Sequence, residues 1–337
     1  MNVLAAVVIL VFGFLLHMLP QLTRPGLFFA VTISPGLRES EEGRRILKRY
    51  RQILWSSTLA AIAVLLLVGA PLLAMALQAA GYVWAFLLSR QRTLRHAAAP
   101  DPILELDLDA PPERLPGGAV ISLIPIGALG VLGLWASQHM DRLPARMAVH
   151  WGLQGADRWV ATTRGTLLGL LAVYALTCLL LAGTAWGLLH ASRRIATSGP
   201  AARSERRFRR QIALMILLAE YLVIAPAVFA LLAPTARVSM IWALAFTALM
   251  VGFGVVLLRA GQGGTRTLPS PAAAPTGDHT PDHCWKWGLV YVNPADPSIL
   301  VEHRFGVGYT LNLGNRWSWV AMMALLALVG SAVVFLR

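Results

Sequence analysis

The sequence predicts an all-α transmembrane bundle of about eight helices with a small cytoplasmic β-containing region. Of its 337 residues, 57% are hydrophobic and only 13% are charged, whereas charged residues make up about 25% of a soluble domain. The hydrophobic residues gather in runs close in length to the roughly 20 apolar residues that a bilayer requires. The basic residues lie mainly between these runs, which is the pattern of a multi-pass helical membrane protein.

Eight apolar runs define the predicted spans. They cover residues 3–19, 53–68, 72–89, 120–136, 166–190, 212–232, 238–258 and 318–336. The second and third spans come from one stretch, residues 53–89, which is too long for a single helix. Pro71 suits the first turn of a new helix and interrupts an old one, so we place the split at Gly69-Ala70-Pro71.

The distribution of lysine and arginine gives the predicted orientation. With eight spans, most basic residues fall on one side of the membrane, whereas joining the second and third spans divides them almost evenly. The positive-inside rule therefore favours eight spans with both termini outside, in a bacterial inner membrane. The net charge of +13 is explained in the same way, and we expect the lipid bilayer, and no nucleic acid, to be the partner of these charges.

Four segments are predicted along the chain. Residues 1–136 hold the first four membrane helices with their cytoplasmic loops, and residues 137–260 hold an outer loop and helices five to seven. Residues 261–284 are rich in Gly, Pro, Ala and Thr, a composition that predicts a flexible linker. Residues 285–337 predict a C-terminal β-hairpin module and the last membrane helix.

The inner loops predict some structure of their own. Ser40 can cap a polar helix near residues 40–51, with Glu41 and Glu42 in its first turn. The Arg-rich residues 191–210 predict a helix extension along the lipid headgroups. We hypothesise that the short predicted strands form one cytoplasmic β-layer, because none alone could hide its apolar face. These strands are residues 27–33, 104–109, 289–292, 299–303 and 305–311.

The outer loop between the fourth and fifth predicted spans carries a motif made of Leu143, Pro144, His150, Trp151, Gly155 and Asp157. It resembles a bacterial membrane domain known as domain of unknown function 1648. Two positions depart from that family: Ala148, where proline is common, and Gly152, where Asn or Asp is common. The same domain occurs in SdpI-like proteins, which give immunity to a peptide toxin and take part in signalling. The resemblance implies a non-enzymatic protein that recognises a peptide or another membrane protein through His150, Trp151, Gly155 and Asp157.

Taken by themselves, the residues of this loop leave several interpretations open. His150 and Asp157 are of the types that bind zinc, but dedicated metal sites show denser Cys and His spacing. We therefore predict neither a metal nor a cofactor. His150 can instead hydrogen-bond a backbone carbonyl while Asp157 caps the approach to the fifth span, or the two can serve peptide recognition. Trp151 can be an interfacial anchor, as tryptophans often are at this depth.

Glu220 is the charged residue within the sixth predicted span, residues 212–232. A carboxylate inside a bilayer is costly, so it usually faces the bundle interior and marks a pathway, a ligand or a partner. Glu220 is therefore a candidate ligand-binding residue, and the alternative function is a transporter or channel that uses it. The structural interpretation is that Glu220 is protonated, or hydrogen-bonded to Tyr221, His17 or a neighbouring helix, and fixes the packing of the helices.

The C-terminal segment carries a second resemblance. The run from Trp285 to Pro297, followed by Arg304-Phe305-Gly306 and Asn312, is similar to a tail module known as domain of unknown function 5808. The resemblance covers residues 285–319 and implies little about activity.

No motif in the sequence predicts an enzyme. The chain has no His-Glu-x-x-His, no Gly-x-Ser-x-Gly, no phosphate loop and no dinucleotide fingerprint, so we predict no catalytic residue. Glu105, Asp107 and Asp109 share one face of a predicted strand, which is typical of the solvated side of an edge strand. Cys178 and Cys284 are not expected to form a disulfide, because the first lies in an apolar run and the second in a polar loop.

Overall fold

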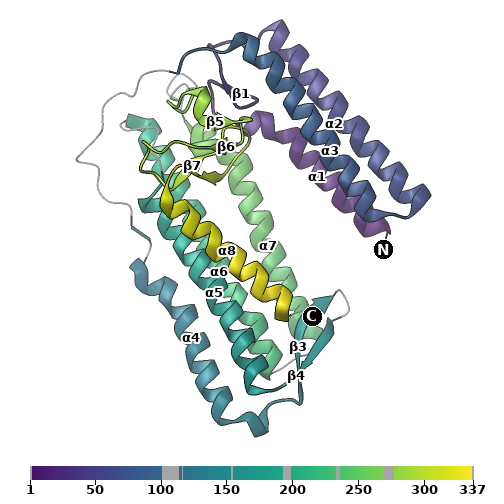
Figure 1. The fold of residues 1–337 in the computed structure, drawn as a ribbon, viewed down its shortest axis with the longest axis vertical. Coiled ribbons are helices and arrows are strands. Elements are labelled where there is room, and N and C mark those ends of the chain that lie inside the picture. Colours follow the sequence, from purple (N-terminus) through teal and green to yellow (C-terminus); the bar gives the residue numbers. More distant parts are fainter. Residues whose placement is uncertain are drawn as a thin grey trace. The chain divides into compact units, whose positions relative to one another are not determined.

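The computed structural model describes residues 2–100, 114–115, 117–152, 155–192, 199–232, 236–268 and 277–335 (Figure 1). The chain divides into two compact units that each contain segments distant in sequence. Unit 1 consists of Met1–Asp109, Arg193–Glu205 and Leu257–Gly314, and unit 2 consists of Ala110–Ser192, Arg206–Val256 and Asn315–Arg337. The boundaries of the four segments expected from the sequence stay a prediction.

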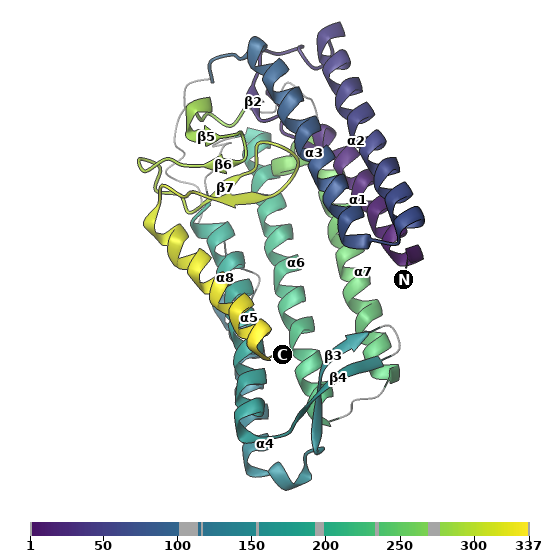
Figure 2. The same cartoon turned by 45° about the vertical axis from the view of Figure 1, so that its right-hand side comes forward.

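The described residues are mainly helical (Figures 1 and 2). The helices are α1 (Asn2–Leu22), α2 (Glu41–Val68), α3 (Pro71–Thr93), α4 (Gly118–Gln138), α5 (Arg164–His190), α6 (Gly199–Leu232), α7 (Ala236–Ala260) and α8 (Arg316–Phe335). Within these residues, seven helices are long and apolar enough to cross a membrane. The apolar stretch of α8, Arg316–Ser331, is shorter than these seven. A largely helical chain with helices long and apolar enough to span a membrane is thus confirmed, whereas the number of eight spans stays a prediction.

The expected split between the second and third spans is confirmed. Gly69 ends α2 with a left-handed backbone at φ 70°, and its N–H donates to the carbonyl oxygen of Leu65 over 3.1 Å. Glycine adopts this conformation without the steric cost that a Cβ adds. Pro71 is the first residue of α3, where its missing N–H costs no hydrogen bond.

The polar helix and the second span form one continuous helix, α2. Its first turn begins as expected, because the Ser40 side chain accepts a hydrogen bond from the Gly43 N–H over 3.1 Å. Glu41 and Glu42 occupy the positive first turn. A similar extension precedes the apolar part of α6, which begins at Gly199 within the Arg-rich segment.

Helices α1, α2 and α3 lie side by side in unit 1 (Figures 1 and 2), and an aromatic cluster fills their common end. Phe29 stacks on Phe305 with ring centroids 5.3 Å apart, and Phe86 lies 4.9 Å from Phe305. The Tyr50 hydroxyl donates to the carbonyl oxygen of Leu16 over 2.8 Å. This cluster therefore buries the apolar side chains of the loops that connect the helices.

The strands of unit 1 form separate hairpins in the described part of the chain. β1 (Leu27–Phe28) pairs with β2 (Val31–Thr32), β5 (Trp285–Lys286) with β6 (Val290–Tyr291), and β7 (Leu300–Glu302) with β8 (Tyr309–Leu311). These residues therefore do not form the single β-layer that we hypothesised, although one isolated parallel bridge, between Tyr291 and Asn312, links the β5–β6 hairpin to the end of β8. Strands of two or three residues offer little length for further pairing, and aromatic packing hides their apolar faces instead.

The segment at residues 27–33 illustrates this correction. Its apolar residues predicted one strand, but the chain turns back at Phe29 and Ala30, which have φ angles of 43° and 61°. Both residues are fully buried, so tertiary packing stabilises a turn that their intrinsic preference opposes. The predicted strand at residues 104–109, with its acidic row Glu105, Asp107 and Asp109, lies outside the described residues.

Buried ion pairs hold distant segments of unit 1 together. Arg24 donates from Nε and Nη2 to Oε2 of Glu302 over 3.1 and 2.7 Å, and Glu205 lies 3.8 Å from the same guanidinium. All three side chains are almost completely buried. Burial raises the pKa of the Glu302 carboxyl, and the negative charge of Glu205 adds to this effect against the opposing charge of Arg24.

A second buried pair ties residue 278 to the last hairpin. Arg304 donates from Nε and Nη2 to the two carboxylate oxygens of Asp278, each over 2.8 Å. Burial alone would raise the pKa of Asp278, but the charge and the hydrogen bonds of Arg304 outweigh it and hold that pKa below its ordinary value. The pair therefore favours the ionised carboxylate.

These contacts include both ends of the predicted linker, residues 261–284. Gln262 is fully buried, and its amide group bonds the backbone of Gly308 twice, over 2.7 and 3.1 Å. Asp278 and Thr280 at the other end are also buried. These two ends are not flexible, because side-chain hydrogen bonds fix them to other segments. The amino-acid composition of the linker does not indicate these bonds. The middle, residues 269–276, lies outside the described residues.

Candidate functional site

The outer loop of the sequence is a β-hairpin in unit 2. β3 (Arg146–Gly152) pairs antiparallel with β4 (Gly155–Ala161) and connects α4 with α5 (Figure 2). Gly152 lies opposite Gly155, which closes the described part of the hairpin. Two glycines at this spacing between residues with aromatic and β-branched side chains are a hairpin signal that the sequence interpretation missed.

The base of the hairpin is fixed to the helices. Met147 is fully buried in an apolar cluster that includes Leu143 and Leu167. Thr163 caps α5, because its side chain accepts from the Thr166 N–H over 3.1 Å. The interpretation of Asp157 as the cap of the fifth span is therefore wrong, since a threonine closer to the helix takes that position.

Two β-bulges surround His150. His150 pairs with Arg158, whereas the neighbouring pairs join Ala148 to Trp159 and Trp151 to Ala156. The register therefore shifts on both sides of His150 and leaves one residue of each strand, Val149 and Asp157, without an opposite partner. A bulge bends the strand and redirects side chains that would otherwise alternate between the two faces.

The hairpin brings His150 and Asp157 into direct contact. Nδ1 of His150 lies 2.5 Å from Oδ1 of Asp157, and the two side chains are 49% and 52% exposed. The hydrogen bond from His150 lowers the pKa of the Asp157 carboxyl. The interpretation in which His150 bonds a backbone carbonyl is therefore wrong for Nδ1, which faces a carboxylate.

The other predicted residues of this motif occupy the tip of the hairpin. Trp151 stands in β3 and Gly155 in β4, at the end of the hairpin where Gly152 lies opposite Gly155; the position of the Trp151 side chain lies outside what the structure describes. Trp159 on β4 is 37% exposed. In the described ranges, no three His, Cys, Asp or Glu side chains gather as a metal would need. The arrangement can offer an ion pair, an aromatic surface and two strand edges to a partner.

Glu220 lies in α6 and is fully buried. It shares one helical face with Ala213, Leu217, Ala227 and Leu231, which are buried as well and follow one another at intervals of three, four or seven residues. The face packs into the apolar cluster that contains Cys178 of α5, whose thiol is within electrostatic reach of the carboxyl. Glu220 is thus a polar group inside an apolar helix contact.

Neither carboxylate oxygen of Glu220 has a hydrogen-bond partner within the described part of the chain. The two expected partners are engaged elsewhere. The Tyr221 hydroxyl donates to the carbonyl oxygen of Ile121 over 2.7 Å, and Nδ1 of His17 accepts from Trp55 over 3.1 Å. The structure therefore does not join Glu220 to either of them, nor to the His150–Asp157 pair. Its chemistry is that of a group that can hold a proton or a cation.

Sequence reasoning did not single out the buried charges of the last hairpin, Glu302 and Arg304. Their neighbours Val301 and Phe305 are also buried, so the strand has no solvated face. The sequence did contain a signal of this burial, because these charged residues lie in a short segment with apolar residues on both sides. Asn312 was quoted only as part of a motif, yet its side chain donates to the carbonyl oxygens of three residues, Asn293, Asp296 and Ser298.

Comparison with protein families gives one match. The model of a family of unknown function, DUF5808, matches residues 294–319, which lie within the segment where the sequence resembles that module. No curated protein and no solved structure matches the chain. The C-terminal resemblance is thus confirmed over residues 294–319, whereas the resemblance of the β3–β4 hairpin to the domain of unknown function 1648 stays a prediction.

Proposed function

We propose that the chain is a non-enzymatic bacterial inner-membrane protein of eight spans that recognises a peptide, or an exposed segment of another membrane protein, through the β3–β4 hairpin. It transmits or neutralises that signal, as the resemblance to SdpI-like proteins implies. The observation that carries the proposal is the exposed His150–Asp157 pair between two bulges.

The geometry of the hairpin supports binding to an extended chain. A two-stranded sheet leaves an unpaired backbone edge on each strand, and extended peptides commonly add a strand to such an edge. Arg146, Arg158 and Trp159 are exposed on the hairpin and add charge and aromatic surface. The His150–Asp157 pair would then fix the register of the added peptide by charged hydrogen bonds.

The orientation is part of the proposal, because the hairpin must lie outside the cell to meet an envelope signal. The excess of basic residues on the opposite loops supports it. Ala145→Cys and Arg203→Cys place single exposed thiols on the two sides. A thiol reagent that cannot cross the membrane should label intact cells carrying Ala145→Cys and spare those carrying Arg203→Cys. The reverse labelling would contradict the proposal.

The function is tested by the tolerance of a deletion strain to a panel of membrane-active peptides. The wild-type chain should raise the inhibitory concentration of at least one peptide, and His150→Ala and Asp157→Ala should each remove that effect at unchanged membrane levels. Arg142→Ala is the control, since Arg142 is exposed just before the hairpin and outside the proposed peptide surface. Equal tolerance with and without the wild-type chain, over the whole panel, would rule out immunity.

One observation favours a second candidate function, a transporter or channel. The carboxyl of Glu220 is buried without a hydrogen-bond partner among the described residues, and intramembrane carboxylates often mark proton or ion pathways. Proteoliposomes loaded with a pH-sensitive dye test this idea. A proton flux that Glu220→Gln abolishes and His150→Ala preserves would favour transport over recognition.

A further inference from the structure

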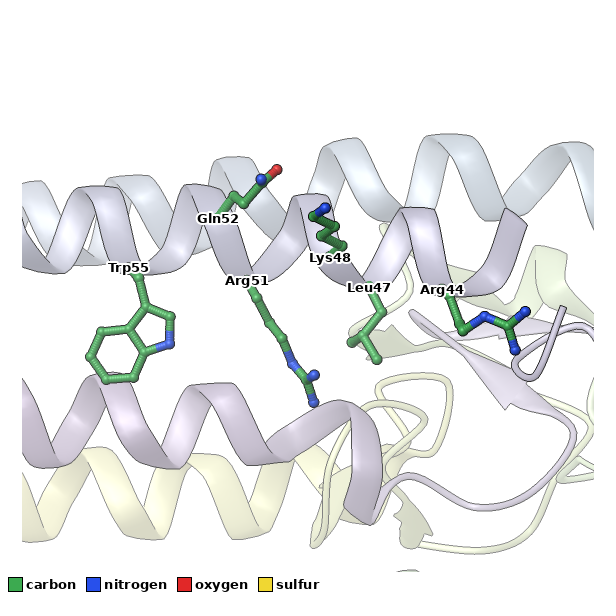
Figure 3. A pocket seen from close by; sticks show the side chains of 6 residues that line it. All are labelled: Arg44, Leu47, Lys48, Arg51, Gln52 and Trp55. Atoms are coloured by element: carbon green, nitrogen blue, oxygen red, sulfur yellow. The ribbon is translucent and has the colours of Figure 1, made fainter. Parts of the chain in front are cut away.

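A groove on α2 is lined by residues from successive helical turns. These are Arg44, Leu47, Lys48, Arg51, Gln52 and Trp55, around a volume of about 580 Å³ (Figure 3). Arg44 and Lys48 are exposed, and Arg51 and Trp55 are half-buried. The indole of Trp55 is fixed at one end, because its Nε1 donates to Nδ1 of His17 on α1 over 3.1 Å. Three cations therefore line a groove that ends in an anchored aromatic ring.

Arg51, which lines this groove, has donors without a partner. Its Nε and Nη2 are shielded from solvent and have no hydrogen-bond partner in the part of the chain that the structure describes. Arg24 and Arg304 use the same two atoms to hold Glu302 and Asp278. Hydrogen-bond donors of a charged group lower the stability of the protein when they are shielded from water and have no partner. The planar guanidinium edge formed by Nε and Nη2 matches two oxygens of an oxyanion.

Carboxylates of the protein do not neutralise this groove. Arg45, on another face of α2, lies 2.5 Å from Glu41 and 4.0 Å from Glu42. Among the described residues, no carboxylate lies within ion-pairing distance of Lys48 or Arg51. Arg45 thus has carboxylate partners, whereas in the groove Arg44 donates to the carbonyl oxygen of Glu39, and Lys48 and Arg51 pair with no carboxylate of the described residues.

The position of the groove along α2 indicates the kind of anion. At 3.6 residues per turn, Arg44, Lys48, Arg51 and Trp55 follow one face of the helix. Leu59 and Leu66 continue that face and are 63% and 65% exposed. The face therefore runs from cations through an interfacial tryptophan to exposed aliphatic side chains, which is the order of headgroup and acyl chain in a phospholipid.

We propose that this groove binds the headgroup phosphate of an anionic phospholipid. Arg44 and Lys48, which are exposed, supply positive charge to the phosphate. The Arg51 side chain turns toward it, so that Nε and Nη2, which are shielded from solvent in the structure, hold two phosphate oxygens. The acyl chain lies along Leu59 and Leu66, a contact that free phosphate cannot make. The site is separate from the β3–β4 hairpin and does not depend on the function proposed for it.

The test uses the full-length protein in nanodiscs of dioleoylphosphatidylcholine with a minor share of dioleoylphosphatidylglycerol, followed by native mass spectrometry of the retained lipid. The wild-type protein should retain phosphatidylglycerol in preference to phosphatidylcholine. Arg51→Gln should weaken that binding about tenfold, the factor expected for one charged hydrogen-bonding group. Phosphatidylglycerol binding by Arg51→Lys should lie between that of the wild type and that of Arg51→Gln, because lysine keeps the positive charge but cannot form a bidentate contact.

Arg45→Gln is the matched control, since it removes one arginine from the same helix outside the groove. It should retain phosphatidylglycerol as the wild type does. Equal losses in Arg45→Gln and Arg51→Gln would overturn the site in favour of general charge attraction. Displacement of the lipid by inorganic phosphate would overturn the lipid assignment. If Arg51→Gln does not fold, Arg51→Lys serves as the test variant. Retention of phosphatidylglycerol by Arg51→Lys at the wild-type level would contradict a bidentate contact.

Discussion

Arg304 and Asp278 form a bidentate ion pair with both side chains buried, and it joins the end of the predicted linker to the β7–β8 hairpin. Removing one partner of a buried pair leaves an uncompensated charge in the interior. We therefore predict that Arg304→Met destabilises the protein by about 3–5 kcal/mol, measured as unfolding of the detergent-solubilised protein.

The control for this prediction is Arg45→Met on α2. Arg45 also pairs with a carboxylate, but its side chain is 66% exposed, and exposed pairs contribute about 0–1 kcal/mol. Equal stability losses in the two variants would show that the Arg304–Asp278 pair is screened by water in the folded protein.

Acid should unfold the C-terminal module through the same pair. Arg304 holds the pKa of Asp278 below its ordinary value, so the folded state binds fewer protons than the unfolded state at that carboxyl. Its contribution to stability is therefore present above the ordinary Asp pKa and is lost as the pH falls through the depressed folded pKa. Unfolding of the wild type should become easier over this acidic range.

Asp278→Asn supplies the comparison, because the amide keeps the shape and carries no titratable group. Its unfolding curve should depend less on pH across the acidic range than that of the wild type. The same pH slope in both proteins would mean that other carboxyls dominate acid unfolding.

Local sequence signals were sufficient for the helices and insufficient for these long-range contacts. Length and hydropathy of the apolar runs, with Pro71 as a helix start, placed the helices because a bilayer leaves few alternatives. Arg24 and Glu302, by contrast, are separated by 278 positions, and no local pattern links them. The strands around Phe29 were misjudged for a related reason, since burial against Phe305 decides their turn.

The candidate residues were predicted by type but not by arrangement. Glu220 could be identified from composition alone, because a charge is conspicuous in an apolar span. His150 and Asp157 were named as a pair, yet their contact depends on two bulges that the sequence did not indicate. The groove on α2 depends on the contact between Trp55 and His17 of α1, and this follows only from tertiary structure.

The turn between α2 and α3 gives a third prediction. Gly69 has a φ of 70°, and a Cβ added there would meet no atom within 4 Å, so the cost of Gly69→Ala is conformational strain. We expect a loss of about 1 kcal/mol in stability. Gly127→Ala in α4 is the control, since that site is equally open and has no positive φ; it should be neutral or slightly stabilising. Equal effects at the two sites would contradict a left-handed helix end.

The exposed His150–Asp157 pair gives a fourth prediction, in which binding and stability separate. Both side chains are about half exposed, so Asp157→Asn should leave thermal unfolding almost unchanged. The same variant should lose peptide tolerance, because the amide cannot provide the negative charge. The double variant His150→Asp with Asp157→His restores a pair with its direction reversed. Full tolerance in Asp157→Asn would show that the charge is not used.

Glu220 gives the last prediction, because an unpartnered buried carboxyl should lower stability where it serves no structural purpose. Among the described residues it has no hydrogen-bond partner and shares its helical face with Leu217 and Ala227. Replacing it with an apolar side chain of similar size removes the cost of an unsatisfied polar group, about 1–3 kcal/mol. Glu220→Leu should therefore raise the unfolding temperature of the solubilised protein, and Glu220→Gln should raise it less. A lower unfolding temperature in Glu220→Leu would mean that a partner holds the carboxyl. The proposal that Glu220 belongs to a proton or ion pathway would then lose its support, because it rests on the absence of such a partner.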